Sequence, residues 1–319
     1  MTSPLVSILI PTYNRAGMVG QAIKSALDQT RDDLEVIVVD NASTDSSWEE
    51  IQAIANRDSR VHAFRNERNL GPVRNWLECV NHAKGKFAKI LWSDDLLDPR
   101  FLEVCLPWIE NEDVAFVCSA IRTFRGKQTD SDNVSMNQFG TSRHSTADFI
   151  QGSLTGGSFP VSPGCALFRT DDLRRNLRLN VPNRIGSDFS MHAIGNDLLL
   201  FLLTCQQYPT FATVAEPLSI FREHEGSITV ASGLDRVVLH YDVVRAYFCH
   251  FHYRGTVLQR KLNTLLWWHL RRLNGGPYGL RSVSDFYPED TETRVSIVHL
   301  LRILSDRLRG RLLNKFSAT

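Results

Sequence analysis

The sequence predicts an α/β fold in which a mixed, mainly parallel sheet is flanked by helices and followed by a helical C-terminal appendage. Apolar runs of strand length alternate with amphipathic stretches of helix length through the first third of the chain. Each run ends in polar or acidic side chains. After about residue 231 only helical periodicity remains. We therefore expect an α/β domain over residues 1–231 and a helical region over residues 232–319.

The first four strands are predicted by short runs rich in Val, Ile and Leu that are bounded by turn residues. These runs lie at residues 5–10, 34–40, 60–65 and 87–92. Between them, apolar residues recur at helical spacing. The corresponding helices are expected at residues 17–29, 48–55 and 73–83. Alternation of this kind favours parallel strands in a doubly wound order.

The middle of the chain continues the pattern less regularly. Helices are expected at residues 101–108, 171–177 and 196–206. Strands are expected at residues 114–120, 162–169 and 211–214, and residues 218–229 close the domain. Residues 125–158 are rich in Ser, Thr, Asp and Gly, so we expect a long loop with one short helix at residues 147–151.

The C-terminal region reads as amphipathic helices at residues 234–274 and 293–314. Residues 291–319 carry six basic and two acidic side chains, a net charge of +4. Two interpretations stay open. The helices pack on the core or on a second subunit as a homo-oligomer, or they make peripheral contact with a membrane surface near anionic headgroups.

Composition limits the class of protein. The net charge of +1 argues against a nucleic-acid-binding surface over the whole chain. The six cysteines show no CxxC pair and lie mostly in apolar runs, so we expect buried free thiols. A strand begins at Leu5, no signal peptide is recognisable, and no apolar run is long enough for a transmembrane span. We therefore expect a cytoplasmic protein, with the inner face of a membrane as the alternative.

The strongest chemical signal is the pair Asp94 and Asp95, which follows the fourth apolar run. Open α/β sheets hold ligands at the carboxyl ends of their strands, and two carboxylates there suit a hard divalent cation that carries phosphates. The alternative is a polar turn into a helix with Asp98 as N-cap and Pro99 as first residue. The first crossover has neither G-x-G-x-x-G nor a Walker A sequence, so a glycine cradle for phosphates is not expected.

With these pieces placed, residues 4–230 resemble glycosyltransferase family 2, the inverting nucleotide-sugar transferases of GT-A fold, a Rossmann-like sheet. Several fragments carry the resemblance in the family's order. They are Val6–Arg15, Glu35–Asp45, Asn69-Leu-Gly with Asn75, Trp92-Ser-Asp-Asp95 at the D-x-D position, Ile194–Asp197 at the G-E-D position, and Phe221–His224.

The resemblance implies transfer of a sugar from a nucleoside diphosphate, with UDP favoured, to a hydroxyl of a glycan or lipid-linked glycan in surface polysaccharide synthesis. It implies Mg²⁺ or Mn²⁺ at the diphosphate, with Asp94 as main ligand and Asp95 supporting it or facing the ribose. His224 completes the metal shell or touches the diphosphate. Asp197 is implied as the general base, and Asp188 is a distant second choice.

Other residues are implied to hold the donor. Asp40 accepts hydrogen bonds from a uracil-like base or the ribose, and Tyr13 stacks on the base. Thr12 and Asn14 supply polar contacts, and Asn69 belongs to the family's N-x-G segment. Arg15 and Arg74 meet phosphate charge, although surface arginines usually do nothing catalytic.

The chain departs from the family pattern at three positions. Trp92 replaces the first acid of D-x-D, Asn41 replaces the second Asp after the second strand, and Asn196 replaces the Glu of Glu-Asp. Trp92 motivates an alternative function, a catalytically inactive nucleotide-sugar-binding or scaffolding subunit. A nucleotidyltransferase is disfavoured because no glycine-rich, lysine-containing phosphate loop is visible after the first strand.

Overall fold

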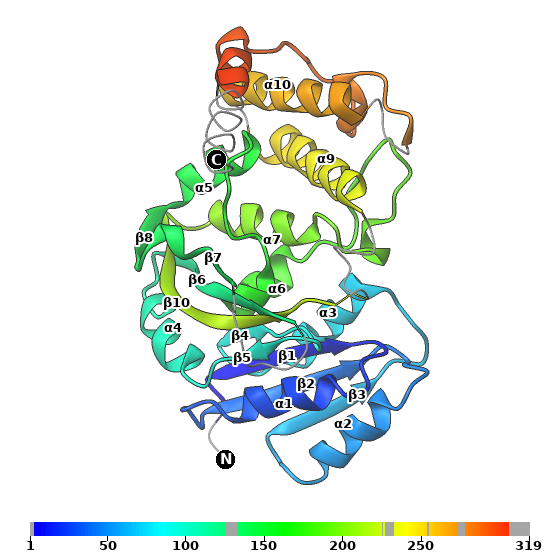
Figure 1. The fold of residues 1–319 in the computed structure, drawn as a ribbon, viewed down its shortest axis with the longest axis vertical. Helices are drawn as coiled ribbons and strands as arrows, with labels where there is room; N and C mark the ends of the chain where they lie inside the picture. Colours follow the sequence, from blue (N-terminus) through cyan, green and yellow to red (C-terminus); the bar gives the residue numbers. More distant parts are fainter. Residues whose placement is uncertain are drawn as a thin grey trace, which may run out of the picture. The chain divides into compact units, whose positions relative to one another are not determined.

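The computed structural model describes residues 3–125, 133–224, 226, 233–253, 255–273 and 278–305 (Figure 1). The chain forms two compact units. The first comprises Met1–Ile150, Phe159–Val181 and Asp188–Ser232, and the second comprises Gln151–Ser158, Pro182–Ser187 and Gly233–Thr319. The sequence predicted a division between residues 231 and 232, and it did not predict that Gln151–Ser158 and Pro182–Ser187 belong to the second unit.

The first unit contains the predicted mixed sheet. Its strands are β1 Val6–Thr12, β2 Leu34–Asp40, β3 Val61–Arg65, β4 Phe87–Ile90, β5 Leu96–Leu97, β6 Val114–Phe124, β7 Asn133–Ser135, β8 Ser142–Ser145, β9 Ala166–Arg169 and β10 Thr210–Arg222. The order is β3-β2-β1-β4-β9-β6-β10-β5. β1 to β4 run parallel, as expected, while β9 is antiparallel to both β4 and β6.

The helices confirm the predicted sequence of elements. They are α1 Val19–Leu27, α2 Ser47–Ala55, α3 Pro72–His82, α4 Phe101–Ile109, α5 Thr146–Leu154, α6 Thr170–Asn176, α7 Asn196–Cys205, α9 Leu234–His252 and α10 Thr256–Leu273. α1 and α2 lie on one side of β1–β3, and α3 lies on the other (Figure 1). Apolar side chains of α1, α2 and α4 pack with alternate residues of β1 and β2 in one core cluster.

Two local predictions are corrected. Asp98 does not cap a helix that begins at Pro99, because α4 begins at Phe101 and the preceding Leu96–Leu97 pairs with β10. The Asp98 carboxylate instead accepts the Arg100 N–H in a turn. The described part of the predicted loop, residues 133–158, is more regular than expected, since β7, β8 and α5 lie within it. Polar residues form β8 because it pairs with β10 and alternates exposed and half-buried positions.

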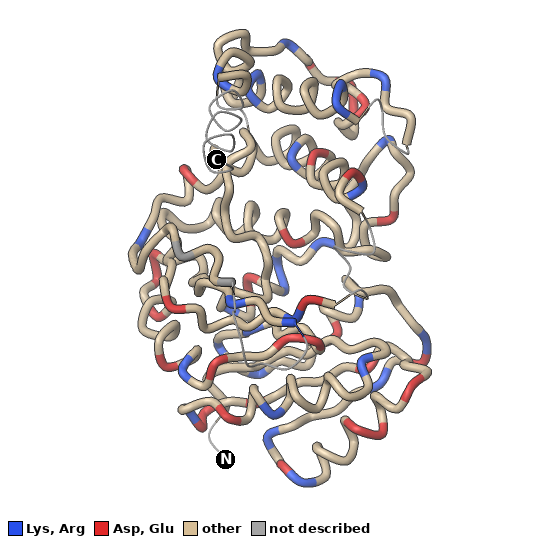
Figure 2. Tube along the Cα trace, in the orientation of Figure 1, with Lys and Arg blue, Asp and Glu red and all other residues tan. Residues whose placement is uncertain are grey.

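All six cysteines are free and buried, as predicted. Acidic and basic residues are interspersed along the chain (Figure 2). In the described part of the chain, no helix is long and apolar enough to cross a bilayer.

The second unit contains the predicted C-terminal helices in a modified form. The stretch 234–274 is two helices, α9 and α10, rather than one. The expected amphipathic character is confirmed for α10, since Leu258, Leu262, Leu265 and Leu266 are buried. Residues 297–305 are helical, and the remainder of the predicted helix at 293–314 beyond residue 305 lies outside the described residues.

Lys89 is a basic side chain in the middle of β4, and it is fully buried. Its Nζ donates a hydrogen bond to the carbonyl oxygen of Gly164 and lies 4.7 Å from the centroid of the Phe101 ring. Removal from water lowers the pKa of Lys89 to about 8. The strand therefore carries a group whose charged form opposes folding.

We predict that Lys89→Met changes how stability depends on pH. Between about pH 8 and pH 10.5, the unfolded chain keeps Lys89 protonated while the folded chain releases the proton. The unfolded state therefore binds more protons, and wild-type stability rises with pH relative to the variant, by about 2 kcal/mol between pH 7 and pH 9.5. Urea unfolding of both proteins at the two pH values measures this, and a pH-independent difference would contradict it.

Candidate active site

Four chain segments bring polar side chains to the carboxyl edge of the sheet. β1 and β2 end side by side with Thr12 opposite Asp40. The turn after β4 carries Asp94 and Asp95, and the end of β10 reaches this turn because the Arg222 N–H donates to Asp95 Oδ1 at 2.8 Å. The edge where an open α/β sheet holds its ligands is thus the edge that sequence analysis selected.

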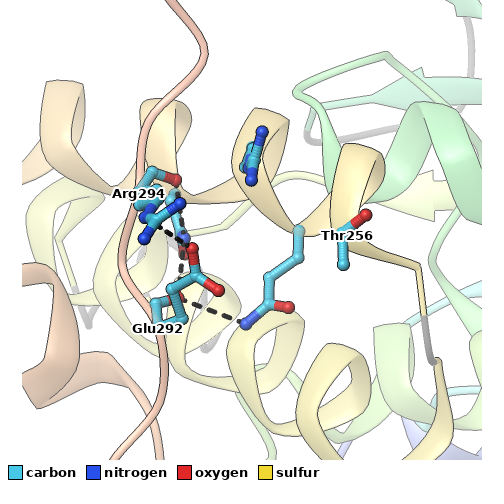
Figure 3. Close-up of a pocket in the computed structure, with 6 residues that line it drawn as sticks. Thr256, Glu292 and Arg294 are labelled. Carbon is cyan, nitrogen blue, oxygen red and sulfur yellow. Dashed lines mark hydrogen bonds and ion pairs between the residues drawn. The ribbon is translucent and has the colours of Figure 1, made fainter.

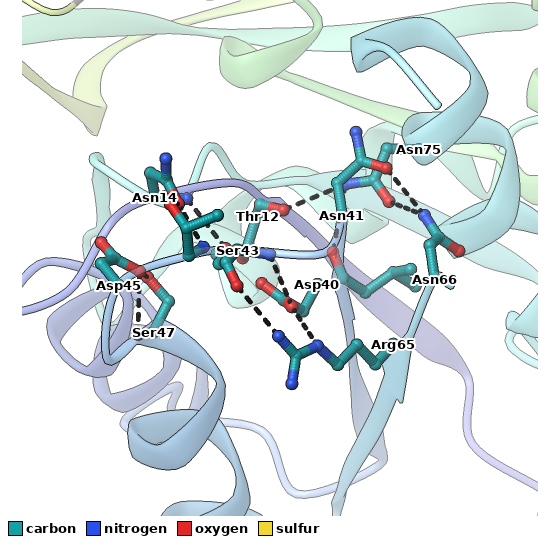
Figure 4. A network of polar contacts seen from close by, with 12 residues as sticks. Thr12, Asn14, Asp40, Asn41, Ser43, Asp45, Ser47, Arg65, Asn66 and Asn75 are labelled. Atoms are coloured by element: carbon teal, nitrogen blue, oxygen red, sulfur yellow. Dashed lines mark hydrogen bonds and ion pairs between the residues drawn. The ribbon is translucent and has the colours of Figure 1, made fainter. Parts of the chain in front are cut away.

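Asp40 is a fully buried carboxylate at the end of β2 (Figure 4). Its Oδ2 accepts the Ser43 N–H at 3.1 Å and lies 3.1 Å from Arg65 Nε. Its Oδ1 is buried and has no hydrogen-bond partner among the described residues. A buried oxygen without a donor is costly, and a bound ligand that offers an N–H or O–H would satisfy it.

An asparagine network follows Asp40 and fixes the start of α3 (Figure 4). Asn41 Nδ2 donates to Asn69 Oδ1 at 2.9 Å and to the Gly71 carbonyl at 3.3 Å, while its Oδ1 accepts from Asn66 and from the Leu70 N–H. The Gly71 N–H in turn donates to Asn69 Oδ1. Asn41 therefore faces two acceptors and two donors, a set that an amide matches and a carboxylate does not.

The loop after β1 is held by the turn after β2. Asn14 has a positive φ of 51° and its Oδ1 accepts the Thr44 N–H at 2.8 Å. The Asn14 N–H donates to Ser43 Oγ, and the Thr12 carbonyl accepts the Asn41 N–H. Tyr13 is 40% exposed, so its ring is available to a base. The residues of this loop that are predicted to bind the sugar nucleotide therefore lie on the same sheet edge as Asp40 and Asn69.

Asp94 is the centre of the charged half of the site. Its Oδ2 lies 3.0 Å from Arg15 Nε and 2.9 Å from His224 Nε2. The Arg222 guanidinium donates to the Asp94 carbonyl at 2.9 Å. The structure thus brings Arg15, Asp94 and His224 together from three distant parts of the sequence.

Asp95 occupies a different environment from its neighbour. The residue is only 5% exposed, and its Oδ1 is taken by the Arg222 N–H. Burial raises the pKa of Asp95 well above its ordinary value, and the adjacent Asp94 charge raises the pKa further. These contacts make Asp95 a support for the end of β10.

The donor set for a divalent cation is small. Asp94 and His224 offer one carboxylate and one imidazole, and no group of three or more His, Cys, Asp and Glu gathers within the described residues. Mg²⁺ and Mn²⁺ sites that serve phosphates commonly use one or two carboxylates, with phosphate and water oxygens completing the shell. The residues present fit a cation that arrives with a diphosphate.

Trp92 and Arg74 make contacts of other kinds. The Trp92 ring packs at 4.8 Å on Trp76, and its Nε1 lies 3.5 Å from Ser162 Oγ. The tryptophan therefore packs against α3 just beyond the end of β4. Arg74 donates to Ser190 Oγ, which itself donates to Asp188 at 2.6 Å.

Asp197 is the second residue of α7, two positions after the N-cap residue Gly195, whose φ is 95°. Its Oδ1 accepts the N–H groups of Gly195 and Leu198 at 3.1 and 2.8 Å. These bonds hold one oxygen of a half-buried carboxylate in place. By contrast, hydrogen bonding from Ser190 lowers the pKa of Asp188, which disfavours Asp188 as a proton acceptor.

Sequence reasoning missed two basic residues. Arg65 ends β3 and faces Asp40 in the parallel register, a neighbour that strand order predicts once β3 is placed beside β2. Lys89 lies beneath the site in a run that reads as apolar, and no sequence signal marks it.

Comparison with protein families gives one match. The model of "Glycosyl transferase family 2" matches residues 7–177. EpsH of Bacillus subtilis, described as a glycosyltransferase, is 30% identical over 162 residues, 50% of this chain and 46% of EpsH. Chondroitin synthase of Pasteurella multocida is 40% identical over 103 residues, 32% of this chain and 11% of the synthase. The chain thus spans less than half the length of these relatives.

Solved structures show the same fold at low identity. TarS of S. aureus in complex with UDP-GlcNAc has a TM-score of 0.62 at 18% identity, over 85% of this chain and 74% of TarS. The mannosyltransferase PcManGT of Pyrobaculum calidifontis, in complex with GDP-Man and Mn²⁺, has a TM-score of 0.51 at 17% identity, over 86% of this chain and 76% of PcManGT.

We predict that Asn41→Asp destabilises the protein by about 1–3 kcal/mol. The new carboxylate oxygen faces Asn69 Oδ1 and the Gly71 carbonyl, and neither acceptor is able to donate a proton to it. Urea unfolding measures the loss. The matched control is Asn56→Asp, at an exposed helix end. It lowers the free energy of unfolding by only a few tenths of the loss expected for Asn41→Asp. Equal stabilities of the two variants would contradict the amide-specific network.

Proposed function

Because this chain belongs to glycosyltransferase family 2, we propose that it is an inverting, metal-dependent enzyme. It transfers a sugar from a nucleoside-diphosphate sugar, preferably a UDP-sugar, to a hydroxyl of a glycan or lipid-linked glycan. The observation that carries the proposal is that two features lie on one sheet edge. These are the buried Asp40 Oδ1, which has no hydrogen-bond partner among the described residues, and the ion pair between Arg15 and Asp94. The resemblance to synthases of extracellular polysaccharides supports a place in surface polysaccharide synthesis.

The nucleoside occupies the Asp40 end in this proposal. Uracil offers an N–H that would pair with Asp40 Oδ1, the buried oxygen without a partner. Tyr13 stacks on the base, and Thr12, Asn14 and Asn69 line the same edge. TarS was crystallised with UDP-GlcNAc, which supports a uridine nucleotide here.

The diphosphate occupies the Asp94 end. Asp94 and His224 would hold Mg²⁺ or Mn²⁺, with Asp95 supporting them from beneath. When bound, the cation supplies positive charge against the leaving diphosphate. Arg15 adds a fixed positive charge at the same place, and Arg74 extends it from α3. The bound Mn²⁺ of PcManGT supports this use of a divalent cation.

The acceptor is activated by Asp197. As the acceptor oxygen bonds to the anomeric carbon, its proton passes to the Asp197 carboxylate, and the bond to the nucleoside diphosphate breaks on the opposite face. The anomeric centre inverts in this single displacement, and no covalent enzyme intermediate is formed. The two N–H donors of Gly195 and Leu198 keep the carboxylate oriented for the transfer.

A screen of nucleotide-sugar hydrolysis with the purified protein tests the proposal. Turnover of one UDP-sugar that requires Mn²⁺ or Mg²⁺ is the expected result. Trp92 at the first D-x-D position favours the second candidate, an inactive donor-binding subunit. Metal-independent binding of UDP-sugars by calorimetry, with no turnover of any donor or acceptor tried, would support that candidate instead.

We predict that Asp94→Asn weakens Mn²⁺-dependent binding of the UDP-sugar at least about tenfold. The change removes the charge that faces Arg15 and His224 while it keeps the side-chain shape. Titration calorimetry with and without Mn²⁺ measures the effect. Asp33→Asn, which breaks an Arg–Asp ion pair before β2, is the matched control and leaves binding unchanged. Unaltered Mn²⁺ dependence in Asp94→Asn would remove Asp94 as a ligand.

We predict that Asp197→Asn preserves donor binding and lowers transfer about 10²–10⁴-fold. The amide oxygen still accepts the two backbone N–H groups, so only the proton acceptor is lost. Donor affinity by calorimetry and initial rates of transfer separate the two effects. Asp171→Asn, at an exposed position on α6, is the control with wild-type rates. A fully active Asp197→Asn enzyme would overturn the assignment.

A further inference from the structure

The helix at residues 297–305 turns its most apolar face to solvent. Four large apolar side chains on it are strongly exposed: Leu304 at 40%, Leu301 at 61%, Ile297 at 71% and Val298 at 80%. At 100° per residue these four positions fall within an arc of about 120°. Surface helices normally turn such a stripe towards the core, so this arrangement is reversed.

The opposite face of the same helix is the one that packs. His299, Leu300 and Ile303 are half-buried and point away from the exposed arc at helical spacing. The inward face is therefore already occupied, and the apolar arc is an additional surface. A continuous apolar face on one helix marks an interaction site more often than scattered exposed residues do.

The chain that leads into this helix is anchored on α10 (Figure 3). Asn263 Nδ2 donates to the carbonyls of Glu292 and Arg294 at 3.1 and 3.0 Å, and the Ser296 N–H donates to Thr264 Oγ1 at 2.8 Å. The Arg294 guanidinium pairs with the Glu292 carboxylate in the same place. These bonds hold the segment that ends at Ser296, the residue immediately before the helix.

We propose that this face binds the surface of an anionic lipid bilayer. Arg302 is exposed beside the apolar arc. The sequence after it adds Arg307, Arg309, Arg311 and Lys315 against Asp306, and residues 291–319 carry a net +4. Basic side chains near an anionic bilayer each contribute about 1 kcal/mol, and apolar side chains enter the headgroup boundary. A second copy of the chain would bring the same positive charge, which disfavours self-association through this face.

Co-sedimentation of the full chain with vesicles tests the proposal without reference to catalysis. We expect binding to vesicles of phosphatidylcholine with phosphatidylglycerol, and much weaker binding to phosphatidylcholine alone. The double variant Val298→Glu with Leu301→Glu lowers partition at least about tenfold, because two exposed apolar contacts become repelled charges. Both side chains are solvent-exposed, so we expect the variant to fold normally, and urea unfolding verifies this.

The matched control is Leu234→Glu, which places the same charge at an exposed apolar residue on α9. Its partition matches that of the wild type if the proposed face is responsible. Three outcomes overturn the proposal: no binding to anionic vesicles, equal loss of binding in Leu234→Glu, or a solution dimer that Leu301→Glu dissociates.

Discussion

One carboxylate oxygen organises the charged half of the site. Asp94 Oδ2 is shared by Arg15 from the loop after β1 and by His224 from the end of β10. These contacts connect the loop after β1 with the turn after β4 and with the end of β10, and the pairing of Leu96–Leu97 with β10 connects the last two as well. Any anionic ligand that binds Arg15 and His224 competes directly with Asp94. Binding of the sugar nucleotide and the position of the Asp94 carboxylate are therefore coupled.

The other half of the site is held by neutral amides. Asn41, Asn66, Asn69 and Asn75 satisfy one another and the backbone around α3, so neutral hydrogen-bonding groups hold this end of the site. Asp40 is the exception, because its Oδ1 is buried without a partner among the described residues. A rigid neutral frame around one unsatisfied oxygen favours a ligand recognised by hydrogen bonds, whereas the Asp94 half favours one recognised by charge.

The sequence predicted the order of strands and helices in the first unit because each apolar run ends at a turn signal and periodicity changes with it. It also placed Asp40, Asp94 and His224 at strand ends. It did not predict that Arg65 pairs with Asp40, since strand order is needed first. It missed β5 and β8, because Leu96–Leu97 and Ser142–Ser145 become strands only by pairing with β10. It predicted amphipathic periodicity over residues 293–314 without indicating that Ile297, Leu301 and Leu304 are exposed.

Asp95 and Lys89 are two ionisable residues near this edge whose burial disfavours their charged forms. Both are buried, and burial moves the pKa of each towards the neutral form, upwards for the carboxyl and down to about 8 for the amine. The Asp95 Oδ1 accepts the Arg222 N–H and so fixes Arg222, which lies two residues before His224. Trp92 fills the strand end against Trp76 where the family often has a further acid. Of the two neighbouring acids in the turn after β4, Asp94 is the one whose carboxylate contacts Arg15 and His224, so a hard cation bound here would draw most of its ligands from the diphosphate of the donor.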